Sequence, residues 1–143
     1  MKALRFNGSL WCNLDVALRN LDRIYAKVTE PLGVSVIEWY VLRALAEKDG
    51  QRASDLAQIV GRLPASFTPI LDNLERRKLI VRRSDPRDRR AIRIHLTTKG
   101  KSLRAKVRTS AAEIDARVQA QAENDEEWAA FLRVLAGLQN VGK

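Results

Sequence analysis

Cysteine and histidine are nearly absent from this sequence, which has one of each among its 143 residues. A single cysteine, Cys12, excludes a disulfide within the chain. Because the chain also has only one histidine, it offers too few sulfur and nitrogen ligands for a usual structural zinc site. We therefore expect neither a bound metal nor a cofactor.

Long apolar segments are also missing. No stretch approaches the roughly 18 consecutive apolar residues that a membrane-spanning helix needs. The first residues include Lys2 and Arg5 but no continuous apolar run of the kind found in signal peptides. The sequence therefore predicts a cytoplasmic protein without a membrane partner.

Catalytic residue patterns are the third absence. The sequence has no Ser/His/Asp set, no carboxylate pair at a useful spacing and no glycine-rich phosphate loop. A chain of 143 residues with 45% apolar residues suits one globular domain. These features predict a single-domain binding protein rather than an enzyme.

Positive charge is what the sequence has in excess, and it is concentrated in one region. The formal net charge is +9, but the window from Arg76 to Arg108 holds fourteen lysine or arginine residues against two acids. That window carries +12, which leaves −3 for the rest of the chain. Positive charge concentrated in one third of the sequence indicates a polyanionic partner. The plainer alternative is that these residues are solvated charges on exposed surfaces.

Residues 54–77 have the pattern of two short helices joined by a tight turn. The first covers residues 54–60, and Gly61 follows where a helix end favours a left-handed residue. The second begins at Pro64, whose fixed φ suits the first turn of a helix. Its apolar residues recur at helical spacing: Phe67, Ile70, Leu71 and Leu74. Its other side carries Ala65, Ser66, Thr68, Pro69 and Asn73.

Two β-rich runs follow this helix pair, at residues 79–83 and 91–96. Between them, residues 84–90 contain an Asp-Pro sequence that can reverse the chain and close a hairpin. An arginine-rich loop beside a helix that fits the major groove can hold duplex DNA across adjacent grooves. The sequence therefore predicts a mainly α-helical winged helix-turn-helix with a small β-hairpin wing.

Amphipathic helices are expected on both sides of this region. Residues 10–28 have an apolar stripe, and Ser35 with Glu38 forms a capping-box pattern before the next helix. A short strand is expected near residues 51–53. Downstream, apolar residues recur every three or four positions from Leu103 to Ala122.

Side chains able to cap helices precede the last two expected helices. A threonine hydroxyl, from Thr97 or Thr98, can cap the start of the long helix that covers residues 103–122, and Asn124 can cap the final one. The first helix and the last two carry more apolar surface than a small winged domain can cover alone. We infer a two-fold homodimer in which these helices interlock, with a monomeric helical bundle as the alternative.

One domain is expected over residues 1–143. Its winged helix-turn-helix part should cover residues 34–98. Its helical dimerisation part should combine residues 8–30 with residues 99–143.

Four segments occur in a distinctive order: Leu56–Ala57, Thr68–Ile80, Asp85–Ala91 and Leu96–Gly100. They contain the sequences Leu-Glu-Arg-Arg-x-Leu, Asp-x-Arg-Asp-x-Arg and Leu-Thr-x-x-Gly. Together they resemble the MarR family of bacterial winged helix-turn-helix transcription regulators, and the match covers the whole chain. The resemblance implies an obligate dimer that represses nearby genes until a small molecule or an oxidant relieves the repression.

Two positions depart from the family pattern. Lys78 stands where the family often has glycine at the end of the recognition helix, which predicts a less usual turn there. Pro69 stands where many members have arginine, which removes a phosphate or base contact and should bend the helix.

A symmetric dimer would place two recognition helices about 34–36 Å apart on a pseudo-palindromic operator in double-stranded DNA. We expect Ser66 and Thr68 to hydrogen-bond bases, and Ala65 and Pro69 to contact thymine methyl groups. Asn73 lies on the same side of the predicted helix.

The wing should supply much of the sequence discrimination. Arg87, Arg89 or Arg90 should enter a narrow A·T-rich minor groove, and Asp88 should orient one of them through a hydrogen bond. Phosphate contacts, which fix the register of the protein on DNA, are expected from Arg62, Asn73, Arg76, Arg77, Arg82 and Lys99.

The resemblance places an effector pocket near Tyr25, Trp39, Tyr40 and Arg43, which would suit a phenolic or aromatic-acid ligand. The alternative is that these aromatic residues belong to the core. Cys12 offers another mode of regulation. One branch of the family senses hydroperoxides through a cysteine early in the first helix, to which tyrosines hydrogen-bond. A free thiol that acts as a small buried apolar residue is the plainer interpretation.

A protein of another class would also fit the charge, namely a sequence-tolerant architectural or RNA-binding protein. Competition binding separates the two classes. A regulator should prefer its operator over random duplex by roughly 10³-fold or more.

Overall fold

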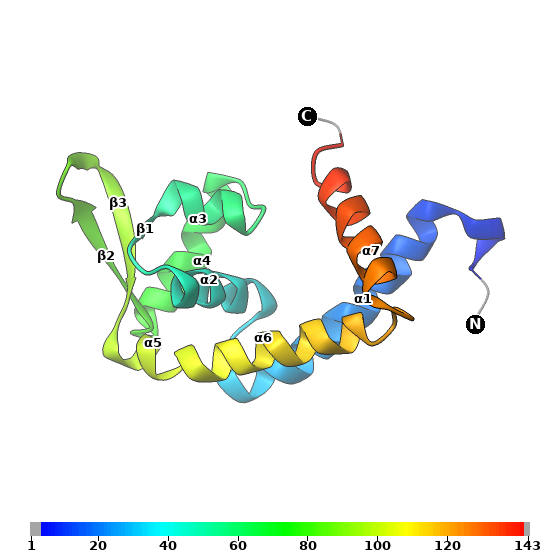
Figure 1. The fold of residues 1–143 in the computed structure, drawn as a ribbon. Helices are drawn as coiled ribbons and strands as arrows, with labels where there is room; N and C mark the ends of the chain where they lie inside the picture. Colours follow the sequence, from blue (N-terminus) through cyan, green and yellow to red (C-terminus); the bar gives the residue numbers. More distant parts are fainter. Residues whose placement is uncertain (1–3, 142–143) are drawn as a thin grey trace. The chain divides into compact units, whose positions relative to one another are not determined.

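The computed structural model describes residues 4–141 of the chain. Figure 1 shows mostly helical elements and one small sheet. In chain order these are η1 Phe6–Gly8, α1 Leu10–Thr29, η2 Glu30–Leu32, α2 Val36–Glu47, β1 Gln51–Arg52, α3 Ala53–Ile59, α4 Pro64–Arg76, β2 Ile80–Asp85, β3 Asp88–Leu96, α5 Thr98–Ser102, α6 Arg104–Gln119 and α7 Asp125–Leu138. The chain divides into two compact units, one ending at Ser110 and the other beginning at Ala111. The predicted fold class is confirmed.

Hydrogen bonds at the helix starts confirm the caps expected from the sequence. The Glu38 N–H donates to Ser35 Oγ (3.3 Å) and the Ser35 N–H donates to the Glu38 carboxylate (2.8 Å), which completes the capping box of α2. The side chains of Thr97 and Asn124 each accept a backbone N–H at the starts of α5 and α7, at 3.0 and 2.9 Å. Gly61 has a φ of +65°, as the turn between α3 and α4 requires.

The helix predicted from Leu103 to Ala122 is wrong in its extent. The structure has α5, a break at Leu103, and then α6, which ends at Gln119. At the break the Leu103 N–H donates to the carbonyl of Gly100, three residues back (3.1 Å). After α6, the N–H groups of Gln121 and Ala122 also bond three residues back. These tighter turns interrupt the α-helical ladder at both ends of α6.

The sheet has three antiparallel strands in the order β1-β3-β2. The expected short strand is present as β1, in which Gln51 pairs with Ile94 of β3. The hairpin strands are longer than predicted, because β2 runs to Asp85 and β3 begins at Asp88. The loop predicted over residues 84–90 is therefore too long, since only two residues remain in the turn.

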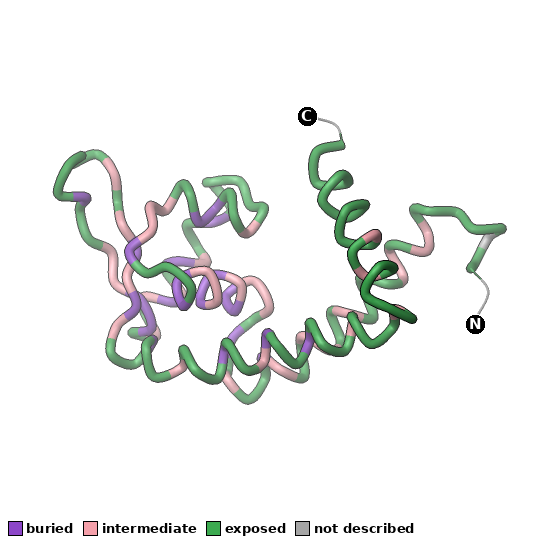
Figure 2. The backbone as a smooth tube through the Cα atoms, in the orientation of Figure 1, coloured by how far each residue is buried: buried purple, intermediate pink, exposed green. Residues whose placement is uncertain are grey.

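The apolar core of the first unit lies between α2, α3, α4 and the base of the hairpin (Figure 2). Trp39 and Leu45 of α2, Leu56 of α3 and Leu74 of α4 are fully buried. Burial of each such side chain stabilises the fold by roughly 1.5–3 kcal/mol. The core therefore holds one side of α4 and leaves its opposite side facing outward.

Two helices expose large apolar side chains. In the first unit, α1 exposes Leu10, Trp11, Leu14 and Leu18. In the second unit, α7 exposes Phe131, Leu132, Val134, Leu135 and Leu138. No helix within residues 4–141 combines the length and the apolar character that crossing a membrane requires.

Candidate nucleic-acid interface

The outward side of α4 carries four residues that were expected to contact bases. Phe67, Leu71 and Leu74 are buried and pack this side of the helix against the core. Four residues on the other side are exposed: Ala65, Ser66, Thr68 and Pro69. The first helical position is Pro64, and Leu63 before it has extended backbone angles, so the chain enters α4 as predicted.

Both hydroxyl groups on this surface are bonded to the backbone of the preceding turn. Ser66 Oγ donates to the carbonyl of Leu63 (3.0 Å), and Thr68 Oγ1 donates to that of Pro64 (3.3 Å). Because each hydroxyl hydrogen is used in this way, each oxygen is left as an acceptor. In a major groove these oxygens suit the amino groups of adenine or cytosine.

Asn73 is placed differently from the other four residues. Its side-chain N–H₂ donates to the carboxylate of Glu38 in α2, and the residue is half-buried. Asn73 lies at the edge of the polar side of α4, where α2 packs against it. It therefore faces the inside of the first unit and not the exposed surface of the recognition helix.

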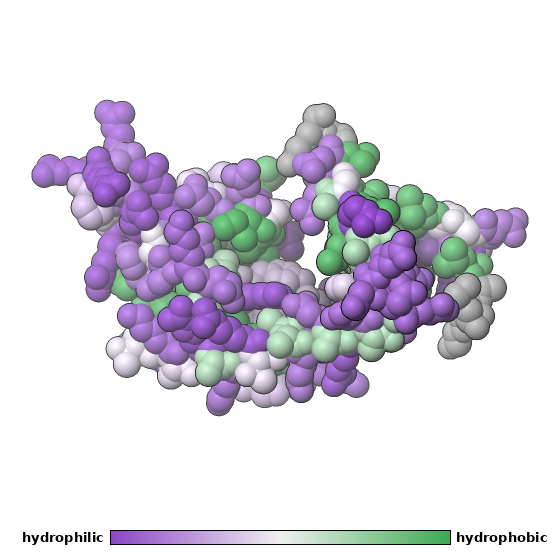
Figure 3. Space-filling model, in the orientation of Figure 1, coloured by the Kyte–Doolittle hydropathy of each residue, from purple (hydrophilic) through white to green (hydrophobic). Residues whose placement is uncertain are grey.

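The hairpin presents three exposed arginines, Arg87, Arg89 and Arg90. Their guanidinium groups have no ion-pair partner within residues 4–141. The pairing of β2 with β3 shifts after Ser84, so residues 89–91 have no opposite residue in β2. Such a bulge re-aims side chains at the end of a hairpin. Figure 1 shows the hairpin extending away from the helices, and Figure 3 shows a hydrophilic surface at its tip.

The sequence predicts that Asp88 orients an arginine side chain of the wing, but within residues 4–141 its carboxylate has other partners. Its carboxylate accepts the backbone N–H of Arg90 (3.1 Å) and lies 4.0 Å from Nη2 of Arg52. Asp88 therefore shapes the backbone of the tip and links β3 to β1.

Asp85 is buried at the end of β2, and three donors converge on it. They are Arg93 Nε (2.8 Å), Arg52 Nε (3.3 Å) and the backbone N–H of Arg87 (3.0 Å). The Arg87 N–H, followed by Arg93 and Arg52, holds the pKa of Asp85 below its usual value although burial opposes this. The ionised carboxylate therefore organises the turn of the wing.

We predict a pH-dependent effect of Asp85→Asn. Because the pKa of Asp85 is lower in the folded protein than the usual 3.8, its carboxylate stabilises the fold above that pH. This contribution is lost as the pH falls through the folded value. The variant should have a lower free energy of unfolding at about pH 7 and 5, and the deficit should shrink towards about pH 3. Urea denaturation measures this, and a deficit that stays constant would contradict the assignment.

Of the predicted phosphate-contact set, Arg62, Arg76 and Lys99 are exposed. Within the described part of the chain the side chains of Arg62 and Arg76 have no hydrogen-bond or ion-pair partner. Arg77 instead lies 3.4 Å from the Glu38 carboxylate, and Lys99 Nζ donates to the Arg77 carbonyl (3.1 Å). Of the predicted set, Arg62 and Arg76 therefore offer a phosphate guanidinium groups that are unengaged within residues 4–141.

Arg82 links the wing to the recognition helix. Its guanidinium donates to Asp72 (2.6 Å) and to Glu75, and its backbone N–H donates to Glu75 (3.1 Å). Burial lowers the pKa of Arg82, but the hydrogen bonds with Asp72 and Glu75 outweigh it and raise the pKa. The phosphate contact predicted for Arg82 would require it to leave both carboxylates.

Lys78 closes α4 in a left-handed conformation, with a φ of +61°. The Lys78 N–H donates to the carbonyl of Glu75 (2.8 Å), and the Leu79 N–H to that of Leu74 (3.0 Å). Lysine thus adopts the conformation that glycine forms without strain.

Replacing Lys78 with glycine should raise the free energy of unfolding by about 1 kcal/mol, because left-handed backbone costs other residues ~1–2 kcal/mol. Urea denaturation measures the change. Lys48→Gly is the matched control, since Lys48 ends α2 with an extended φ of −141°. An equal gain in both variants would contradict the strain at Lys78.

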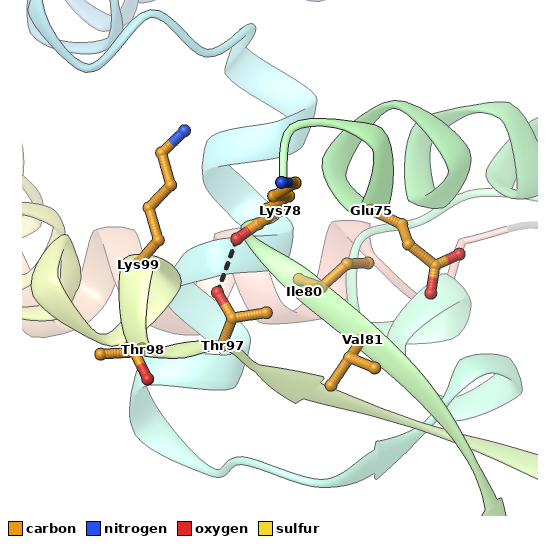
Figure 4. A pocket seen from close by; sticks show the side chains of 7 residues that line it. All are labelled: Glu75, Lys78, Ile80, Val81, Thr97, Thr98 and Lys99. Atoms are coloured by element: carbon orange, nitrogen blue, oxygen red, sulfur yellow. Dashed lines mark hydrogen bonds between the residues drawn. The ribbon is translucent and has the colours of Figure 1, made fainter.

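Figure 4 shows the open hollow below this corner, about 480 Å³ in volume. Thr97 Oγ1 donates to the Lys78 carbonyl (2.6 Å) and so fastens the corner to the end of β3. Ile80 pairs with Leu96 at this end of the hairpin, whereas the turn lies at the other end. A strand of six residues spans roughly 17 Å. Lys99, which lines the hollow, is therefore remote from the arginines of the wing tip.

The four residues of the predicted effector pocket form one cluster. Tyr25 of α1 lies 5.3 Å from Trp39 and 5.5 Å from Tyr40, measured between ring centroids, and both contacts are edge-on. The guanidinium carbon of Arg43 lies 5.6 Å from the centroid of Trp39. Trp39 is fully buried and donates to Ser110 Oγ (3.1 Å). Burial, followed by Tyr25, raises the pKa of Tyr40 to about 12, so its hydroxyl stays protonated at neutral pH.

Cys12 is a half-buried free thiol near the start of α1. Tyr25 lies thirteen positions later in the same helix, which is roughly 20 Å along the axis. Tyr25 therefore cannot hydrogen-bond Cys12 of its own chain. Within residues 4–141 no three His, Cys, Asp or Glu side chains gather in a way that could hold a metal ion.

Comparisons with known proteins agree with this architecture. Residues 32–91 match the model of the MarR family. Over 115 residues, the chain is 30% identical to the uncharacterized HTH-type transcriptional regulator YhbI of Bacillus subtilis. That match covers 80% of this chain and 73% of YhbI.

Solved structures with the same fold include regulators whose binding partners are known. The transcriptional repressor CouR, bound to a 23-mer DNA duplex, has a TM-score of 0.82 and 26% identity, covering 98% of this chain and 99% of that one. BpsR of Bordetella bronchiseptica, whose DNA binding is regulated by 6-hydroxynicotinic acid, has a TM-score of 0.83 and 21% identity, with the same coverage.

Proposed function

Because the chain belongs to the MarR family and is a transcription regulator of that type, we propose that it is a dimeric repressor of a pseudo-palindromic operator. The observation that carries this proposal is the pairing of two surfaces in one unit. The outward side of α4 is exposed, and the guanidinium groups of Arg87, Arg89 and Arg90 on the wing have no ion-pair partner among residues 4–141. A helix for the major groove and arginines for the adjacent minor groove are thus available together.

The exposed apolar side of α1 supports the dimer. Trp11 is 85% exposed and Leu18 is 60% exposed, on a helix whose other residues include many charges. The apolar side of α7 is also uncovered within its own unit. Symmetric association of two copies would remove these side chains from water.

Base recognition in this proposal falls to Ser66 and Thr68 as acceptors, with Ala65 and Pro69 against thymine methyl groups. Arg62 and Arg76 contact phosphates and fix the register. The structure of the related repressor CouR, which is bound to a 23-mer DNA duplex, supports duplex DNA as the partner.

We assign effector binding to the cluster of Tyr25, Trp39, Tyr40 and Arg43. The half-buried rings of Tyr25 and Tyr40 would contact the ring of a phenolic or aromatic-acid ligand, and Arg43 would bind the acid group. The regulation of BpsR by 6-hydroxynicotinic acid supports an effector of this chemical class. The distance between Cys12 and Tyr25 in α1 gives the hydroperoxide-sensing alternative no support within one chain.

The proposed function is tested by selecting duplexes from a random-sequence pool with the wild-type protein. The enriched duplex should be pseudo-palindromic, should bind two chains, and should compete at least ~10³-fold better than random duplex. Equal competition by random duplex would instead indicate an architectural protein. Strong binding by one chain would contradict the dimer.

A further inference from the structure

Glu38 is a buried carboxylate that joins the start of α2 to the recognition helix. It is 5% exposed, and donors from three positions reach it. Its Oε2 accepts the backbone N–H of Ser35 (2.8 Å) and lies 3.4 Å from Nη1 of Arg77. Its Oε1 accepts the side-chain N–H₂ of Asn73. The capping box therefore accounts for only part of what this carboxylate binds.

A buried carboxylate is tolerated only when its charge and lone pairs are satisfied. Ser35 alone would leave Glu38 without a neutralising group. Arg77 supplies the positive charge and Asn73 supplies a second N–H. Asn73 lies in the C-terminal half of α4, and Arg77 is the C-cap residue of the same helix, four positions later. The buried charge is thus stabilised only when α4 has one particular rotational orientation about its axis.

That rotation also determines where the exposed residues of α4 point. Ser66 and Thr68 lie on the N-terminal half of the same helix, on the side away from the core. Phe67, Leu71 and Leu74 hold α4 against the core through apolar contacts, which are not directional. Hydrogen bonds are directional, so the Glu38 contacts define the rotation more closely than the apolar contacts do.

We propose that Glu38 is a positioning residue for operator recognition. Asn73 and Arg77 then bind the Glu38 carboxylate rather than contact DNA. This inference rests on the proposed function. It assigns a role in specificity to a residue of α2 that would not touch the duplex. It also replaces the base and phosphate contacts that the sequence indicated for Asn73 and Arg77.

Glu38→Gln should weaken binding to the enriched duplex about tenfold, because the charge-assisted hydrogen bonds are lost. Binding to random duplex should change less than about twofold, since the arginines of the wing are untouched. Asn73→Ala should have the same effect, and the double variant should lose no more than either single one. Fluorescence anisotropy with both duplexes, over a range of salt concentrations, measures all three.

Arg77 and Arg76 provide a second comparison. Arg76→Ala should reduce the slope of log affinity against log salt by about one, as removal of a phosphate contact does. Arg77→Ala should leave that slope unchanged and should lower only the preference for the enriched duplex.

Glu47→Gln is the matched control for Glu38→Gln, because Glu47 lies on the same helix as Glu38 but is exposed and pairs with Arg108 at the surface.

Three results would overturn the inference. One is additive losses in the Glu38/Asn73 double variant, and another is a lower salt slope in Arg77→Ala. The third is a loss of preference in Asn73→Ala that Glu38→Gln does not share, since Asn73 would then contact a base itself. If Glu38→Gln does not fold, Asn73→Ala and Arg77→Ala still decide the matter. A wild-type protein without a preferred duplex would overturn the proposed function, and the inference with it.

Discussion

Replacing Arg87, Arg89 and Arg90 together with alanine should weaken binding to the preferred duplex about 10³-fold, or roughly tenfold for each side chain. The three guanidinium groups are exposed at the tip of the hairpin and have no ion-pair partner within residues 4–141. Nothing in the described fold therefore depends on them. Fluorescence anisotropy at several salt concentrations should also show a slope reduced by about one per arginine.

The control for the wing variants is Arg117→Ala, which removes an exposed arginine from α6. It lowers the net charge by one, as each single wing substitution does, but leaves the wing intact. Its affinity and salt slope should stay close to those of the wild type. Equal losses in Arg117→Ala and in a single wing variant would mean that net charge alone governs binding.

Replacing Gly100 with alanine should destabilise the fold by about 3 kcal/mol or more, because it forces a side chain into an occupied space. A Cβ at Gly100 would lie 2.0 Å from the carbonyl oxygen of Leu79 and 3.2 Å from Cδ2 of Leu96. The first of these atoms belongs to the backbone of the hairpin base and cannot move aside cheaply. Thermal and urea denaturation should show the loss.

Gly137 in α7 provides the control for this prediction. A Cβ there meets no atom within 4 Å, and the residue is helical. Gly137→Ala should therefore keep or raise the free energy of unfolding, by up to about 1 kcal/mol. A similar loss in both variants would show that close packing at Gly100 is not the cause.

The sequence predicted the local features of the fold well, because short-range patterns encode them. Ser35 with Glu38 forms the expected capping box, and Gly61 is left-handed as expected. Helical spacing identified the buried side of α4 and, with it, the exposed Ser66 and Thr68. Each of these features depends on residues within a few positions of one another.

Contacts between distant segments could not be predicted in the same way. The partner of Asn73 lies 35 residues earlier, and Asp85 is held by Arg52, 33 residues away. A carboxylate in an arginine-rich loop looks exposed in the sequence, whereas Asp85 is buried and shortens the turn to two residues. Among many Lys and Arg residues, an Asp or Glu that is buried and organises its surroundings can be recognised only once the packing is known.

Hydroxyl-radical footprinting on the enriched duplex tests the central claim most directly. The wild-type protein should protect two minor-groove segments placed symmetrically about the dyad, flanking two major-groove sites roughly one helical turn apart. Those minor-groove protections should disappear when Arg87, Arg89 and Arg90 are replaced with alanine, while the dyad symmetry remains. Protection without two-fold symmetry, or minor-groove protection that persists without the three arginines, would contradict the account.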